Sequence, residues 1–367
     1  MHLDSLTIKN FRILEDVTIE KLGHVNLIVG KNNSGKSTVL EALALLASGF
    51  DLKTVQKLVD NRNVNRHGVL KIESEQTETI QPKFDEKLFL NLLTRGEDSS
   101  QNVIDIGSKS FYLQVGYAQN RYIGFLDSSK YINESDNYFT LKNQFPSNDL
   151  MIRSSFKLIN SGLVTGVSGI DYPPFPKYQF VDTGSINIET LATEWEQIAL
   201  TNEEDLVVKM LQLIDENIQN IAFLTDTNTN FRVPFVRLKG VENRIPLHSM
   251  GDGIFRLLQI IFKVINSRNG FLLIDEFENG LHYSVQPEVW RLIFELAHRF
   301  NIQVFATTHS WDTIESFAQI AKERTDMDGV LFRMGHSVRK SDNGKLIATV
   351  FDEEKLYHLT KIQMEVR

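Results

Sequence analysis

The stretch GKNNSGKST, residues 30–38, decides the fold. From Gly30 to Ser37 it fits GxxxxGK[ST], the pattern of a phosphate-binding loop. The segment VNLIVG before it (25–30) predicts a buried strand, and KSTVLEALALLA after it (36–47) predicts a helix. Because such a loop works between a strand and a helix, this context favours a phosphate loop over a glycine turn that happens to precede a lysine.

The loop would bind phosphate mainly through its backbone. Glycines let successive N–H groups turn toward an anion, and the positive end of the helix dipole adds to the attraction. Lys36 would reach the β- and γ-phosphates of a nucleotide, and the Ser37 hydroxyl would bind Mg²⁺. The predicted nucleotide contacts are Gly30, Asn32, Asn33, Ser34, Gly35, Lys36, Ser37 and Thr38.

The segment FLLIDE, residues 271–276, supplies a second element of the same kind of site. Its four apolar residues predict a central strand, and ligands bind at the carboxyl ends of parallel strands. Asp275 would hold Mg²⁺ through its water shell, and Glu276 would polarise the water that attacks the γ-phosphate. Two adjacent acids can also form a plain solvated loop, but the phosphate loop makes the catalytic interpretation the better one.

His309, in VFATTHS, follows the next predicted strand and should face the same phosphates. A histidine there can sense the γ-phosphate, although a lone histidine at a strand end is more often structural. We therefore predict a role for His309 only in combination with the other motifs.

Composition narrows the class of protein. The chain has 367 residues, 42% of them hydrophobic, which can fill one large core. It has no cysteine, so disulfides and thiolate zinc sites are excluded, and its nine histidines form no HExxH motif. A net charge of −8 excludes a surface that is basic all over. The sequence shows neither a signal peptide nor a membrane span, and we expect a cytoplasmic protein.

The order of predicted elements indicates an α/β fold. Strands and helices alternate at both ends of the chain, which predicts a parallel, doubly wound sheet. Between the ends the pattern changes to short alternating segments and then amphipathic helices. We predict a discontinuous ATPase-like core, 1–50 with 236–367, and an α+β insertion, 51–235.

These motifs together resemble the ABC-type ATPases, specifically the branch that includes the SMC, RecF and OLD (overcoming lysogenization defect) proteins. The resemblance rests on four stretches: LTIKNFRILEDVTI with the phosphate loop, SMGDGIFRLLQI, LLIDEFENGLHYSVQ and FATTHSWDTIESF. It implies a P-loop fold of the ABC or SMC-head type, with a mostly parallel sheet and an antiparallel N-terminal β part. It also implies ATP and Mg²⁺ as ligands.

The resemblance also implies a dimer that closes over the nucleotide. In ABC-type proteins the turn before the signature helix contacts the ATP of a second protomer, which here assigns Ser249 and Gly251 to the γ-phosphate in trans. A helix N-terminus with a glycine can bind an anion in this way. From the residues alone, Ser249-x-x-Asp252 is also a capping box that would serve any helix.

Some features depart from the pattern of relatives. HSMGD stands where transporter-like proteins carry a serine and two glycines, which weakens a transport function. The Q-loop glutamine is unassigned, with Gln101, Gln114 and Gln119 as candidates. No long heptad run predicts a coiled-coil arm.

Many OLD proteins carry a TOPRIM nuclease domain after the ATPase. Only 58 residues follow His309, so we expect none here, and Asp326 and Asp328 should be turn residues. The family analogy favours an ATP-driven sensor or regulator of a separate effector, a nuclease among the possibilities, in bacterial antiphage defence or genome maintenance. A RecF-like DNA-binding repair factor and a nucleotide-gated scaffold with negligible hydrolysis stay open as alternatives.

Overall fold

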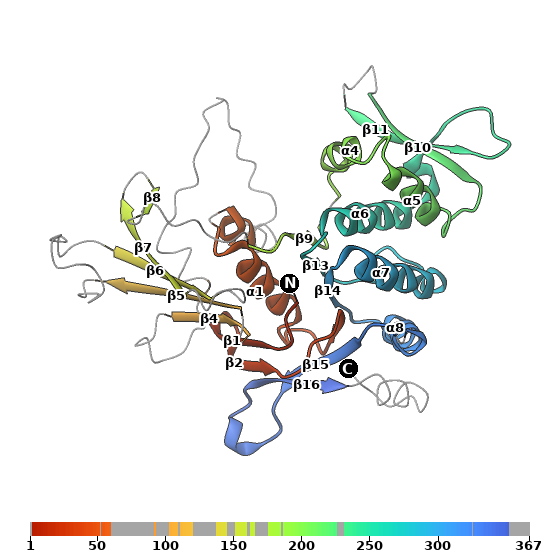
Figure 1. Ribbon diagram of the computed structural model, residues 1–367. Coiled ribbons are helices and arrows are strands. Elements are labelled where there is room, and N and C mark those ends of the chain that lie inside the picture. The colour runs from red at the N-terminus through yellow and green to blue at the C-terminus, as the bar shows by residue number, and fades with distance from the viewer. Residues whose placement is uncertain are drawn as a thin grey trace.

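The computed structural model shows a central sheet covered on both faces (Figure 1). It describes most of the N-terminal and C-terminal thirds of the chain and parts of the middle. The described residues are 2–51, 53–59, 92, 103–108, 111–119, 137–144, 151–159, 162–165, 175–184, 186–225, 231–324 and 326–351.

The central sheet has six strands in the order β16-β15-β3-β14-β13-β9. All neighbours pair in parallel except β16, which is antiparallel to β15. The carboxyl ends of β3, β14 and β13 therefore meet at one edge of the sheet. The strands are β3 (Val25–Val29), β9 (Tyr178–Val181), β13 (Phe271–Ile274), β14 (Gln303–Thr307), β15 (Gly329–His336) and β16 (Leu346–Phe351).

Both faces of this sheet are buried, which explains why its inner strands are mostly apolar. Alternate residues point to opposite faces, so Leu27 and Ile28 belong to two different hydrophobic clusters. Three helices cover one face and one helix covers the other (Figure 1). These are α6 (Asp252–Asn266), α7 (Gln286–Phe300) and α8 (Trp311–Glu323) on the first face, and α1 (Lys36–Ser48) on the second.

A second, antiparallel sheet lies beyond α1, in the order β2-β1-β4-β5-β6-β7-β8. Apolar side chains of its first strands, such as Ile8 and Ile106, pack with α1 in one buried cluster. Helix α1 is therefore enclosed between the two sheets. The strands are β1 (Leu6–Phe11), β2 (Leu14–Ile19), β4 (Val103–Gly107), β5 (Tyr112–Gln119), β6 (Asn137–Gln144), β7 (Met151–Ile159) and β8 (Gly162–Thr165).

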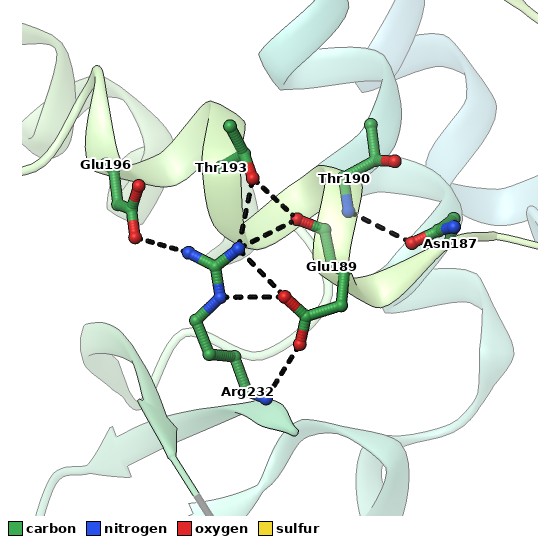
Figure 2. A network of polar contacts seen from close by, with 6 residues as sticks. All are labelled: Asn187, Glu189, Thr190, Thr193, Glu196 and Arg232. Carbon is green, nitrogen blue, oxygen red and sulfur yellow. Dashed lines mark hydrogen bonds and ion pairs between the residues drawn. The ribbon is translucent and has the colours of Figure 1, made fainter. Parts of the chain in front are cut away.

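A smaller lobe packs against α6 on the other side of the molecule (Figure 1). Arg232 joins two of its elements: its guanidinium and backbone N–H bind both carboxylate oxygens of Glu189, and the guanidinium also binds Thr193 and Glu196 (Figure 2). The lobe consists of α4 (Ile188–Glu196), α5 (Asn202–Leu211), β10 (Ile218–Thr225), β11 (Arg232–Leu238) and β12 (Ile245–Pro246). The short helices η1 (Leu247–Met250), η2 (Tyr283–Val285) and η3 (Lys340–Asp342) complete the described elements.

The predicted fold class is confirmed: the sheet is mostly parallel and the N-terminal β part is antiparallel. Strand β9 falls within the range 51–235 that the sequence assigns to an insertion, yet it forms the edge of the central sheet beside β13. The division into core and insertion stays a prediction. The sequence also predicts a final helix at 353–366, and these residues lie outside the described ones. Within the described ranges, no helix combines the length and apolar character needed to span a bilayer.

Candidate active site

The predicted phosphate loop joins β3 to α1, and two of its glycines could not be replaced. Gly30 has φ 144°, and a Cβ there would lie 2.3 Å from the Met334 carbonyl oxygen and 2.6 Å from Ser34 Oγ. Gly35, the N-cap of α1, has φ 90°, and a Cβ there would lie 2.8 Å from Leu14. Both positions combine a left-handed backbone with a space that only hydrogen fits, so the spacing of the motif follows from the packing.

Lys36 lies across the loop that precedes it. Its ammonium donates to the carbonyl oxygens of Gly30 at 2.9 Å and Lys31 at 3.0 Å. Burial lowers the pKa of Lys36, and the nearby carboxylates of Asp275, Glu276 and Glu278 oppose that shift. The lysine is thus a buried cation, held by neutral oxygens that it can exchange for phosphate oxygens.

The other loop residues divide by exposure. Asn32 and Asn33 are exposed, Asn33 with φ 62°, whereas Thr38 and Ser34 are buried. The Ser34 hydroxyl has no hydrogen-bond partner among the described residues. An unpaired buried hydroxyl is costly in a protein interior and is common where a site awaits a ligand.

Asp275 stands at the carboxyl end of β13, next to the loop. Its Oδ1 accepts the Ser37 hydroxyl at 3.0 Å and the Thr307 hydroxyl at 2.5 Å. Oxygen ligands such as these suit Mg²⁺, which needs only one or two carboxylates beside phosphates and water.

Glu276 follows with a left-handed backbone, φ 47°. Its N–H donates to Thr307 Oγ1 at 2.8 Å, and its carbonyl oxygen accepts from the guanidinium of Arg256 at 3.1 Å. Such a conformation is strained for a glutamate and persists only where neighbours fix it. Contacts to β14 and α6 therefore hold the backbone of this half-buried residue.

His309 lies after β14, between the strands that carry the loop and the two acids. Its side chain is exposed, and its backbone N–H donates to Glu278 Oε1 at 2.7 Å. The other oxygen of that carboxylate, Oε2, accepts the Thr308 hydroxyl at 2.7 Å. Glu278 thus ties the segment after β13 to the segment after β14.

Ser249 and Gly251 lie immediately before α6, and both are exposed. Gly251 is the N-cap of the helix, with φ 90°, so the capping box Ser249-x-x-Asp252 considered from the sequence does not form and that alternative is wrong. A Cβ on Gly251 would meet nothing within 4 Å. The turn leaves a helix N-terminus open to the surface.

Three residues of this site were not singled out from the sequence: Arg256, Thr307 and Glu278. Arg256 is 4% exposed and donates to the carbonyl oxygens of Asp182, Asp275 and Glu276. A charged residue within the apolar pattern of α6 was the signal that could have revealed it.

Of the three glutamine candidates, only the Gln114 side chain lies among the described residues. Gln114 donates to Asp105 at 2.7 Å on the neighbouring strand of the antiparallel sheet. Gln101 and the side chain of Gln119 lie outside the described residues.

The two aspartates before β15 lie at the amino end of that strand, which is the opposite edge of the sheet from the loop. Asp326 pairs with Arg324, and the Asp328 carbonyl oxygen accepts from the backbone of His24. The arrangement fits the turn role predicted for them.

Comparison with known proteins agrees with this geometry. The family model described as "AAA ATPase domain" matches residues 1–161 and 182–314, which is most of the chain. The chain belongs to this family. It is thus an ATPase domain of P-loop type, as the motifs predicted.

Individual relatives place it within the predicted branch. The chain is 25% identical over 354 residues to an "ATP/GTP phosphatase" of Helicobacter pylori, covering 88% of this chain and 89% of that protein. It is 23% identical to an "OLD nuclease" of Thermus scotoductus, covering 94% of this chain and 66% of that protein. A stretch of 56 residues is 43% identical to "DNA replication and repair protein RecF" of Nitrosococcus oceani, 15% of either chain.

Among solved structures, the chain is similar to an SMC head in "Crystal structure of the SmcHead bound to the C-winged helix domain of ScpA". The TM-score is 0.50 at 15% identity, over 97% of this chain and 99% of that chain. At this identity the likeness concerns the fold, and it confirms the predicted ABC or SMC-head architecture.

Proposed function

We propose that this protein hydrolyses ATP in the presence of Mg²⁺, at a site that a second copy of the chain completes. The observation that carries the proposal is the meeting of Lys36, Ser37, Asp275 and Glu276 at the carboxyl ends of β3 and β13, the two strands that flank β14. Phosphoryl transfer to water needs three parts: a loop that binds the phosphates, oxygen ligands for a metal ion, and a carboxylate that orients the attacking water.

The excess of carboxylates at this site supports the proposal of a bound metal ion. Asp275, Glu276 and Glu278 lie near Lys36 and Arg256, so these carboxylates outnumber the nearby cations. When bound, Mg²⁺ would supply the positive charge that lets a triphosphate lie beside these carboxylates. Ser37 and Asp275 would hold it, and Lys36 would exchange its loop carbonyl contacts for phosphate oxygens.

Glu276 is the residue we propose as the group that orients and polarises the attacking water. Hydrogen bonds with Thr307 and Arg256 hold its left-handed backbone in place, and a fixed backbone reduces the reorganisation needed at the moment of reaction. His309, exposed at the end of the neighbouring strand, would contact the γ-phosphate.

The open turn at Ser249 and Gly251 supports the proposal of a composite site. It presents a helix N-terminus at the surface, with free space around Gly251 into which a phosphate can approach closely. In a head-to-tail dimer, each copy would bind ATP with its loop and cover its partner's ATP with this turn.

For the biological role, we propose an ATP-driven regulator of a separate effector protein in antiphage defence or genome maintenance. The similarity to an OLD nuclease over 94% of this chain supports it. The RecF-like stretch supports a second candidate, ATP-dependent DNA binding by the dimer. A binding assay with duplex DNA, with and without ATP, separates the two, and the affinity in the second case should fall steeply with salt.

The experiment that tests the enzymatic proposal is phosphate release with Mg-ATP and, in parallel, Mg-GTP. Lys36→Ala should abolish nucleotide retention and turnover, because the buried ammonium that binds the phosphates is lost. Lys31→Ala is the matched control: it lies in the same loop but its side chain is exposed. Wild-type protein that releases no phosphate from either nucleotide, or Lys36→Ala with normal retention, would reject the proposal.

A further inference from the structure

Arg256 lies in the first turns of α6, directly behind the acidic residues. One NH group donates to the Asp275 carbonyl oxygen at 2.7 Å and to that of Glu276 at 3.1 Å. The other donates to the Asp182 carbonyl oxygen, just after β9, at 2.6 Å and to Gln259 Oε1 at 3.0 Å. The planar fork of this guanidinium therefore joins α6 to the ends of two neighbouring strands.

Arg256 is a buried cation whose hydrogen bonds go to neutral oxygens. Burial lowers the pKa of Arg256, and the nearby carboxylates of Asp182, Asp275, Glu276 and Glu278 oppose the shift. Within the described residues, however, its hydrogen bonds go to backbone carbonyl oxygens and to one side-chain amide oxygen. Oδ1 of Asp275 instead accepts from Ser37 and Thr307, on the side of the phosphate loop.

A second contact joins the same two segments. A Cβ on Gly253 would lie 2.6 Å from the Gly280 carbonyl oxygen, and one on Gly280 would lie 3.4 Å from Cβ of Arg256. Gly280 also has φ 74°. The start of α6 consequently rests on the loop 275–280 with no side chain between them.

We infer that Arg256 is a positioning residue, which fixes the Asp275–Glu276 backbone to the start of α6 so that engagement of the Ser249–Gly251 turn sets the direction of Glu276. The inference rests on the proposed function for the last step alone. Gly251 is the N-cap of α6, and Gly253, two residues later, packs against Gly280. The Ser249–Gly251 segment is therefore connected through the start of α6 to the loop 275–280. When the phosphate of a partner's ATP binds the Ser249–Gly251 segment, it therefore also affects the loop 275–280, which carries the Glu276 carboxylate.

The test compares Arg256→Lys with wild type. A lysine keeps the charge but cannot span carbonyl oxygens of two strands with a rigid fork. We expect kcat to fall by about 10-fold or more while the Kd for Mg-ATP, measured by nucleotide retention, changes by less than about 3-fold, because the phosphate loop is untouched. Amide hydrogen exchange at Glu276 and Phe277, without nucleotide, should become faster by about 10-fold or more.

Arg232→Lys is the matched control. From β11 its guanidinium joins α4 through Glu189 and Thr193, and its hydrogen bonds involve neither Asp275 nor Glu276 (Figure 2). It should leave both kcat and the exchange at 276–277 within about 2-fold of wild type. Arg256→Met, if it folds, should show the effects of Arg256→Lys in stronger form.

The outcomes separate this inference from the proposed function. If kcat and the amount of protein that retains ATP fall by the same factor in Arg256→Lys, the role of Arg256 is purely structural and the inference is overturned. Unchanged exchange at 276–277, or unchanged kcat, would overturn it as well. If the wild-type protein shows no ATP turnover, the proposed function is rejected. The hydrogen-exchange comparison would still show whether Arg256 fixes the loop 275–280.

Discussion

Thr307 donates its hydroxyl hydrogen to Oδ1 of Asp275 over 2.5 Å, from the end of β14 to the end of the neighbouring strand β13. The same Thr307 oxygen accepts the backbone N–H of Glu276 at 2.8 Å. One side chain on the middle strand therefore orients both residues that we assign to magnesium and water.

Thr307→Val should keep the shape of this position and remove both hydrogen bonds. We expect kcat to fall by about 10-fold, equivalent to about 1.4 kcal/mol, because the buried N–H of Glu276 loses its acceptor and the Asp275 carboxylate loses a donor. Steady-state phosphate release measures the effect. Thr313→Val is the control, since it removes a buried hydroxyl that donates to Gln286 on α7 at 2.8 Å. Equal losses of kcat in the two variants would contradict a specific role for Thr307.

The sequence predicts the parts of this site that form short motifs. The phosphate loop, Asp275 and Glu276 are recognisable because their chemistry depends on local order: strand, turn and helix, or strand and acid. The parallel sheet follows from apolar runs at both ends of the chain. These predictions need no knowledge of what packs against what.

The other residues depend on contacts between distant segments. Thr307 acts only because β14 lies beside β13, and Arg256 acts only because α6 begins behind the acidic loop. In the sequence, Arg256 is no more than a charge that interrupts an apolar run. Likewise, nothing local distinguishes β9 from the strands before it, although it forms the edge of the central sheet. The capping box at Ser249 failed because Gly251, with φ 90°, starts the helix two residues later.

Ser37→Ala should shift the magnesium dependence of the reaction. The Ser37 hydroxyl lies 3.0 Å from Oδ1 of Asp275, so the variant loses one of two protein groups that we assign to the metal. We expect half-maximal turnover to need about 10-fold more Mg²⁺, with binding still abolished by a chelator. A magnesium titration at saturating ATP measures this. Ser48→Ala, at the far end of α1, is the control. Identical titration curves for Ser37→Ala and wild type would place the metal elsewhere.

Glu276→Gln should retain nucleotide and lose turnover. The amide has nearly the same shape as the carboxylate but cannot polarise water as an anion does, so we expect a loss of about 10²-fold or more. Because ATP would persist at the site, the variant should also accumulate as an ATP-dependent dimer, which light scattering detects. Glu288→Gln, exposed on α7, controls for the loss of one negative charge. Undiminished phosphate release by Glu276→Gln would remove this residue from the mechanism.

Ser249→Arg should separate nucleotide binding from association of two copies. Ser249 is exposed before α6, and the space around neighbouring Gly251 is open, so the larger side chain should not disturb the fold of one copy. In the proposed dimer, the arginine side chain would occupy the space through which the γ-phosphate of the partner's ATP approaches the turn. We therefore expect ATP retention within about 3-fold of wild type, while the dimer trapped in the Glu276→Gln background disappears and turnover falls by about 10-fold or more. Ser341→Arg, exposed on the β15–β16 hairpin, introduces the same charge away from this turn and should preserve the trapped dimer. A dimer that persists in Ser249→Arg with full turnover would show that the α6 turn does not cover the partner's nucleotide.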